Sequence, residues 1–242
     1  MLCSVERTGS TWLSTMLQST GIAGNPRWEY FSNIVETLTA EDEQITSFPD
    51  YLQYVRSAAA TENGVLGINV MWRQVPSALR RIRQTLSLDG VADDETFRRV
   101  LPGLDRFVFL HRVDHLDQAV SWARAHQSGQ WRSYEEPRTT DPKYDFNMID
   151  MCYYSAVADD YAWRTWFGRL GIQPLLVEYE QLTVDAAGVV GGILEYLGLD
   201  PASGRRPQSP LRKQADELSL EWKQRYLRDL KGWRVPSYGL AT

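Results

Sequence analysis

The sequence has few residues of the types that build metal sites and disulfide frameworks. It contains two cysteines, Cys3 and Cys152, and three histidines among 242 residues. Two cysteines without ligand spacing provide neither a disulfide framework nor a zinc site, so we expect both to be reduced and buried. The histidines His111, His115 and His126 follow no metal-ligand spacing. The sequence therefore predicts a site that needs no metal.

Long apolar runs are missing as well. A membrane-spanning helix needs roughly 20 consecutive apolar residues, and the apolar stretches here, such as 107–110 and 175–177, are far shorter. After Val5 the chain turns polar and shows neither the basic region nor the long apolar region of a secretory signal. We expect no membrane span and a cytoplasmic location.

The chain also lacks an excess of positive charge, since its formal net charge is −5. Nucleic acids and anionic membrane surfaces are bound by proteins with a broad basic field. The composition therefore favours a small-molecule ligand over nucleic acid. If the ligand is anionic, a local cluster of cationic side chains has to bind it.

Strand-like and helix-like segments alternate along the chain, which is typical of an α/β sheet. Short apolar segments predict strands at 1–5, 65–70, 106–110 and 175–179. Apolar residues at spacings of three and four predict helices at 11–20, behind Pro49, from Pro76, and over 144–170, 189–197 and 220–230. With 43% hydrophobic residues, we expect a single domain over 1–242, a three-layer α/β sandwich with a mostly parallel central sheet, related to the P-loop nucleotide-binding folds.

The N-terminal strand runs through a short glycine-containing turn into a helix that begins with hydroxylic residues. Such a turn points backbone N–H groups and the positive end of the helix dipole at one place, where a phosphate can bind. Arg7 adds a charge, and the hydroxyls of Ser10 and Thr11 can donate to phosphate oxygens. The alternative is that Ser10 only caps the helix.

A P-loop that binds nucleoside triphosphates ends in Gly-Lys-Ser/Thr, where the lysine contacts the transferred phosphate and the hydroxyl binds magnesium. Here Gly9 is followed directly by Ser10, and the lysine is absent. This difference weakens the hypothesis of a kinase and favours a metal-independent anion site.

Several motifs together resemble one known family. The segment RTGST at 7–11 resembles the 5′-phosphosulfate loop of sulfotransferases that use 3′-phosphoadenosine-5′-phosphosulfate (PAPS). The resemblance to the Stf0 branch of these enzymes covers nearly the whole chain in order. It continues through GIAGNP (21–26), EYF (29–31), NGVLG (63–67), MW (71–72), HR (111–112), QAVS (118–121), WRTWF (163–167), QAD (214–216) and EW (221–222).

The resemblance implies a PAPS-dependent enzyme that transfers a sulfonate group to a hydroxyl of a carbohydrate-like or other small-molecule acceptor and releases 3′,5′-bisphosphoadenosine (PAP). It also implies a homodimer and no metal. It assigns the donor's 5′ end to a set of residues in the N-terminal loop, namely Arg7, Thr8, Gly9, Ser10, Thr11 and Trp12.

The 3′-phosphate of the donor is assigned to Arg112 and Ser121 by the same resemblance. Arg112 follows a predicted strand, and ligands bind beyond the carboxyl ends of strands in open α/β sheets. The alternative for Arg112 is a surface ion pair with Asp114, which would be worth little energetically. Lys213 matches a basic family position and is expected to close over the nucleotide, with solvated surface charge as its alternative.

Sulfonate transfer needs a base for the acceptor hydroxyl and positive charge near the leaving phosphate. By resemblance Glu29 is the general base, and its neighbours Trp28, Tyr30 and Phe31 are aromatic, so partial desolvation could raise its pKa. Its alternative is an exposed loop carboxylate. Arg7 is expected to stabilise the leaving phosphate together with Ser10.

Two other functions stay open from the residues alone. One is a non-catalytic nucleotide-binding or interaction protein, and the other is a divergent small-molecule kinase. Trp72, Trp122 and Trp131 could stack on the sugar rings of an acceptor or could simply belong to the core.

Overall fold

The computed structural model describes residues 1–131, 135–139, 141–209 and 216–232. The chain divides into two compact units. Unit 1 combines Met1–Val113 with Ala158–Pro210, and unit 2 combines Asp114–Val157 with Leu211–Thr242. The expectation of one domain over 1–242 stays a prediction, because two compact units can belong to one folding domain.

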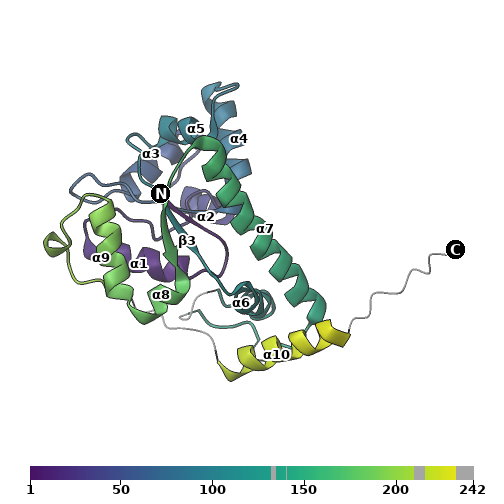
Figure 1. Ribbon diagram of the computed structural model, residues 1–242. Helices are drawn as coiled ribbons and strands as arrows, with labels where there is room; N and C mark the ends of the chain where they lie inside the picture. The colour runs from purple at the N-terminus through teal and green to yellow at the C-terminus, as the bar shows by residue number, and fades with distance from the viewer. Residues whose placement is uncertain (132–134, 140, 210–215, 233–242) are drawn as a thin grey trace. The chain divides into compact units, whose positions relative to one another are not determined.

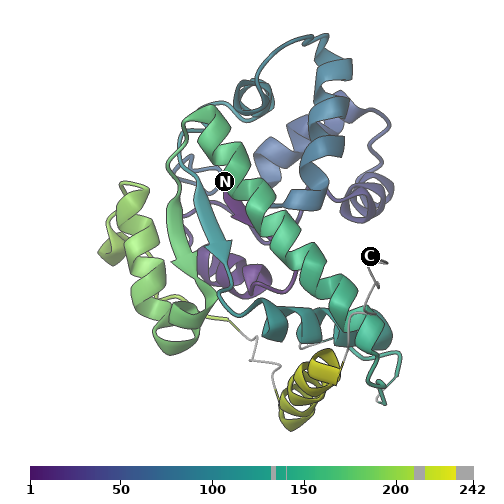
Figure 2. The same ribbon diagram turned by 45° about the vertical axis from the view of Figure 1, so that its right-hand side comes forward.

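A parallel sheet forms the centre of unit 1. Its strands are β1 (Leu2–Ser4), β2 (Asn69–Met71), β3 (Val108–His111) and β4 (Leu175–Glu178), in the order β2-β1-β3-β4. All three neighbouring pairs are parallel, and Figure 2 shows β3 and β4 as adjacent arrows that point the same way. The chain places β2 on one side of β1 and then crosses to place β3 on the other, so the order in which strands are added reverses between β1 and β3.

Helices and short 3-10 segments connect these strands (Figure 1). In unit 1 they are α1 (Ser10–Thr20), α2 (Asn33–Asp42), α3 (Phe48–Ala58), η1 (Trp72–Gln74), α4 (Val75–Leu86), α5 (Asp93–Val100), α8 (Tyr179–Val184), α9 (Ala186–Tyr196) and η2 (Pro201–Ser203). The long helix α7 (Phe146–Leu170) belongs to unit 2 in its first half and to unit 1 in its second half.

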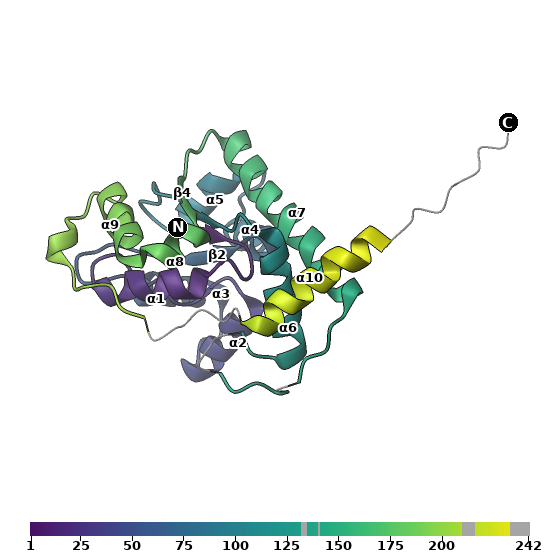
Figure 3. The ribbon, with the colours of Figure 1, turned by 60° about the horizontal axis from the view of Figure 1, so that its bottom comes forward.

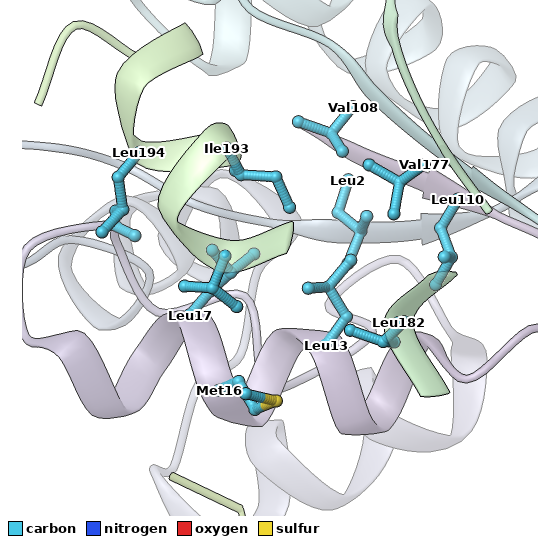
Figure 4. Close-up of a cluster of buried hydrophobic side chains, with 12 residues drawn as sticks. Leu2, Leu13, Met16, Leu17, Val108, Leu110, Val177, Leu182, Ile193 and Leu194 are labelled. Carbon is cyan, nitrogen blue, oxygen red and sulfur yellow. The ribbon is translucent and has the colours of Figure 1, made fainter. Parts of the chain in front are cut away.

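One face of the sheet packs against α1, α8 and α9. Alternate strand residues point to this face, and they meet leucines and valines of the three helices in a buried cluster (Figure 4). Its members are Leu2, Leu13, Met16, Leu17, Ala23, Val108, Leu110, Val177, Leu182, Val190, Ile193 and Leu194. This packing holds the start of α1 against the sheet.

The opposite face of the sheet is covered by the second half of α7. The ring of Phe167 lies 5.5 Å from that of Phe109, and the ring of Trp166 lies 6.0 Å from that of Phe107. The indole of Trp163 is buried and donates a hydrogen bond of 2.8 Å to the carbonyl of Ser4. With helices on both faces of a parallel sheet, the predicted three-layer α/β fold is confirmed.

Unit 2 is helical in its described part. It contains α6 (His115–Ser128), the first half of α7, and α10 (Glu217–Gly232), and α6 and α10 lie side by side in Figure 3. Lys223 of α10 joins Asp114 and Asp117 at the start of α6, at 2.5 and 2.8 Å. Acidic side chains at a helix N-terminus also compensate the helix dipole.

Most of the predicted elements are confirmed, with a few differences. The strand predicted at 65–70 begins at Asn69, because Leu66 forms an antiparallel bridge with Ala60 across a turn. The helices α2, α5 and α8 were not predicted. Helix α2 buries none of its residues, and α5 and α8 have only eight and six residues.

The structure also bears on the expectations about cysteine and membranes. Both Cys3 and Cys152 are buried, as predicted, and neither forms a disulfide. In the ranges that the structure describes, no helix combines the length and apolarity that crossing a membrane requires.

A close backbone approach generates a testable prediction. Gly24 has φ +75°, and a Cβ there would lie 2.2 Å from the amide nitrogen of Gly67. We expect Gly24→Ala to lower the free energy of unfolding by about 3–5 kcal/mol, since backbone strain and overpacking add. Gly64 has φ +81° with no neighbour within 4 Å, so Gly64→Ala should cost only about 1–2 kcal/mol. Equal losses in urea denaturation would contradict the steric argument.

Candidate functional site

The four strands of unit 1 end at one edge of the sheet, and the residues that follow them form the candidate site. The turn at 5–9 follows β1, η1 follows β2, Arg112 follows β3, and Tyr179 follows β4. Parallel strands present their carboxyl ends together, and ligands of open α/β sheets bind beyond that edge, near the point where the strand order reverses. Here that point lies between β1 and β3.

The turn after β1 reverses the chain within five residues. Thr8 donates to the carbonyl of Val5 twice, from its amide nitrogen at 3.3 Å and from its hydroxyl at 2.8 Å. Arg7 and Gly9 both have left-handed backbones, with φ +64° and +87°. For Arg7 this conformation is uncommon, and such residues concentrate at ligand sites.

The start of α1 shows which residue caps the helix. Gly9 is the N-cap, and Ser10 is the first helical residue and is buried. The alternative that Ser10 caps the helix is therefore wrong. The first N–H groups of a helix have no acceptor within it, so the turn directs these donors and the positive end of the dipole toward the carboxyl edge.

One aromatic ring connects the turn with Arg112. A Cβ on Gly9 would lie 2.7 Å from Cδ2 of Tyr179, so the ring packs directly against the glycine. The guanidinium of Arg112 lies 4.5 Å from the centroid of the same ring, and its Nη1 lies 3.5 Å from the carbonyl oxygen of Arg7. The structure thus brings Arg7 and Arg112 to one place.

Arg112 is 6% exposed. A buried cation is costly unless it is compensated, and stacking on an aromatic face supplies part of that compensation. Its burial distinguishes Arg112 from a side chain at the surface. Next to it, burial and the charge of Arg164 lower the pKa of His111, which favours the neutral ring.

Glu29 is partly buried and is held by a side chain of η1. Gln74 donates from Nε2 to Glu29 Oε2 at 2.7 Å and accepts from the amide of Met71 at 3.1 Å. The adjacent Tyr30 and Phe31 are buried. Because its orientation is set by Gln74, Glu29 differs from the exposed loop carboxylate that was its alternative.

Glu6 is a site residue that sequence reasoning missed. Its carboxylate lies 3.8 Å from Nε of Arg73, which also donates to Asp159 at 2.8 Å. The pKa of Glu6 is raised to about 7, mainly by burial. A hydrogen bond to its own backbone and the charge of Arg73 act against this, and the charges of Asp159 and Glu29 add to it. Only its place beside Arg7 could have drawn attention to it.

Tyr179, Arg73 and Gln74 were missed too, although Tyr179 directly follows β4 and the other two lie in η1, which follows β2. Of the remaining predicted residues, Thr11 and Trp12 lie partly buried in the first turn of α1, and Trp12 packs against the core cluster. Ser121 lies on α6 in unit 2, so its convergence with Arg112 stays a prediction. Lys213 lies outside the described residues.

The three tryptophans of the acceptor hypothesis have different environments. Trp72 lies in unit 1 with its ring 5.2 Å from that of Trp163. In unit 2, His126 stacks on Trp122 at 6.2 Å and meets Trp131 edge-on at 5.2 Å. Trp122 is buried, whereas Trp131 is 40% exposed. The described residues contain no group of three or more His, Cys, Asp or Glu that could hold a metal ion.

The pKa of Glu6 predicts a pH-dependent stability. A carboxyl whose pKa is raised from 4.5 to about 7 by folding binds more protons in the folded state, so stability falls as pH rises through this window. Between pH 4.5 and pH 8, we expect the free energy of unfolding of Glu6→Gln to rise relative to that of the wild type, by about 3 kcal/mol at most. Urea denaturation at both pH values measures this, and a constant difference would contradict it.

Known proteins resemble this chain over nearly its full length. A trehalose 2-sulfotransferase of Mycolicibacterium smegmatis is 31% identical over 261 aligned positions, covering 98% of this chain and 97% of the relative. A trehalose 2-sulfotransferase of Mycobacterium tuberculosis is 30% identical over 267 positions, covering 100% and 97%. Among solved structures, the sulfotransferase domain from the Synechococcus PCC 7002 olefin synthase matches with a TM-score of 0.42 and 16% identity, over 97% of this chain and 94% of that one.

The sequence model of the Stf0 sulphotransferase family matches residues 1–229 of this chain. This match spans unit 1 and most of unit 2, and it includes every element that surrounds the candidate site. The resemblance inferred from the motifs is confirmed, and the chain belongs to the Stf0 sulfotransferase family, whose members are enzymes that transfer sulfate.

Proposed function

We propose that the protein transfers a sulfonate group from PAPS to a hydroxyl of a carbohydrate acceptor. The observation that carries this proposal is the meeting of the Arg7 turn, the start of α1 and Arg112 at one point of the sheet edge. In a sulfotransferase, an anion site at this edge suits the donor. The acceptor class is proposed because both curated relatives are named for trehalose.

The residues at the edge fit an anionic nucleotide. The helix N-terminus offers N–H donors, Ser10 and Thr11 offer hydroxyls, and Arg7 offers a guanidinium. Gly9 keeps the backbone free of a side chain where the turn meets Tyr179. We assign the 5′-phosphosulfate to Arg7, Thr8, Gly9, Ser10, Thr11 and Trp12.

The 3′-phosphate is assigned to Arg112. Its stacking on Tyr179 and its burial hold the guanidinium in one orientation, and an oriented guanidinium suits bidentate contact with a phosphate. Ser121 and Lys213 stay proposed partners of the nucleotide. Homodimerisation and a cytoplasmic location also stay predictions.

PAPS supplies the sulfonate group and leaves PAP after transfer. Glu29 accepts the proton of the acceptor hydroxyl, and its hydrogen bond from Gln74 holds the carboxylate in position for this step. Arg7, Ser10 and the N–H groups of α1 stabilise the negative charge that develops on the leaving phosphate. Positioned cations and dipoles suffice for a transition state with dispersed charge, as in phosphoryl transfer, so the proposal includes no metal.

The donor is tested by calorimetric titration without magnesium, using PAP against AMP and ATP. We expect selective binding of PAP, and a loss of roughly 10- to 100-fold in affinity for Arg112→Ala, since a charge-assisted contact is removed. Arg106→Ala is the matched control because Arg106 is an exposed cation before β3, at the opposite edge of the sheet. Selective ATP binding would instead favour a kinase.

The catalytic role of Glu29 is tested by Glu29→Gln. We expect PAP affinity within about twofold of wild type and turnover with PAPS lowered by about 10²- to 10⁴-fold, the usual contribution of a general base. Glu195→Gln serves as the control, since Glu195 is exposed near the end of α9. Unchanged turnover in Glu29→Gln would remove Glu29 from the mechanism, and weakened PAP binding would make it a donor-site residue.

A further inference from the structure

Glu6 has no role in the proposed mechanism, yet it lies within the same edge of the sheet. It directly precedes Arg7, the proposed ligand of the phosphosulfate, and its side chain is 20% exposed. A carboxylate so close to a proposed polyanion site opposes binding when it is ionised and does not oppose it when it is protonated. The charge state of Glu6 therefore matters for any anionic ligand of the turn.

The groups around Glu6 come from η1, from α7 and from the segment before α2. Arg73 of η1 is a nearby cation, and its Nε donates to Asp159 of α7 at 2.8 Å and lies 3.8 Å from Glu6. Asp159 and Glu29 both add negative charge at Glu6. These two carboxylates favour the protonated form of Glu6.

We propose that Glu6 is a proton-linked residue of the donor site, which takes up a proton when the anionic nucleotide binds to the adjacent turn. The inference rests on the proposed function, since it needs a polyanion at Arg7. In this step one proton moves from solvent to the carboxylate of Glu6, and no bond to sulfur or phosphorus changes. Glu6 acts through its charge and is a positioning residue.

Linkage makes the effect reciprocal. If bound phosphate groups favour the protonated form of Glu6, protonation favours the bound phosphates by the same factor. Because burial already brings Glu6 close to half-protonation at neutral pH, a modest further shift moves a measurable fraction of a proton. The affinity for the nucleotide then falls as pH rises above 7, in contrast to a site whose charges do not titrate.

The test is proton uptake during titration with PAP at pH 8, measured by calorimetry in two buffers of different ionisation enthalpy. Phosphate monoesters have a second pKa of about 6, so PAP itself is fully ionised and takes up no proton. We expect wild type to take up a fraction of a proton that Glu6→Gln does not take up. Glu195→Gln removes an exposed carboxylate of α9, and we expect this variant to take up the same fraction of a proton as the wild type.

A second readout is the affinity itself. Between pH 6.5 and 8.5 we expect wild type to lose about three- to tenfold in PAP affinity relative to Glu6→Gln, since a shift of one pKa unit corresponds to tenfold. The ionisation of the ligand cancels in this comparison. If Glu6→Gln fails to fold, the test rests on the wild type alone. The inference is then overturned if the wild type takes up no proton when it binds PAP at pH 8.

The two proposals fail in different ways. Tight PAP binding with equal proton uptake in wild type and Glu6→Gln would overturn the role of Glu6 and leave the proposed donor intact. Absence of PAP binding in every protein at both pH values would overturn the proposed donor and, with it, this inference. Circular dichroism of each variant shows whether a loss of binding reflects a loss of fold.

Discussion

The backbone reversal between β1 and α1 is the constraint on which the candidate site depends. Five residues have to turn the chain from the sheet into a helix, and they do so with two left-handed conformations and a double hydrogen bond from Thr8 to Val5. The buried cluster under α1 holds the helix in place. As a result, the N–H donors of its first turn lie at the carboxyl edge, where Gly9 leaves room for Tyr179.

Tyr179 links this turn to the rest of the edge. It directly follows β4, the strand farthest from β2 in the sheet order, yet its ring contacts both Gly9 and Arg112. A single aromatic side chain therefore connects the turn after β1 with the arginine after β3. The crossover of the chain from one side of β1 to the other makes this possible, because it opens the edge between β1 and β3.

Two neighbouring residues of η1 contact the carboxylates of this edge, since Arg73 lies near Glu6 and Gln74 donates to Glu29. Glu6 belongs to the same turn as Arg7, whose carbonyl oxygen lies 3.5 Å from Nη1 of Arg112. The edge therefore combines cations and carboxylates from the turn after β1, from the end of β3 and from η1.

The sequence by itself determined the alternation of elements and the family, because these depend on local periodicity, on short motifs and on their order, and it predicted an anion site at 7–11. It did not reveal α2, α5 or α8, whose local patterns are weak. Only the tertiary structure decided that Ser10 does not cap α1, that Tyr179 joins Gly9 to Arg112, and that Glu6, Glu29 and Asp159 share one neighbourhood. Those contacts join residues from separate strands and helices, and the strand order that brings them together is set by packing across the whole sheet, which no local pattern encodes.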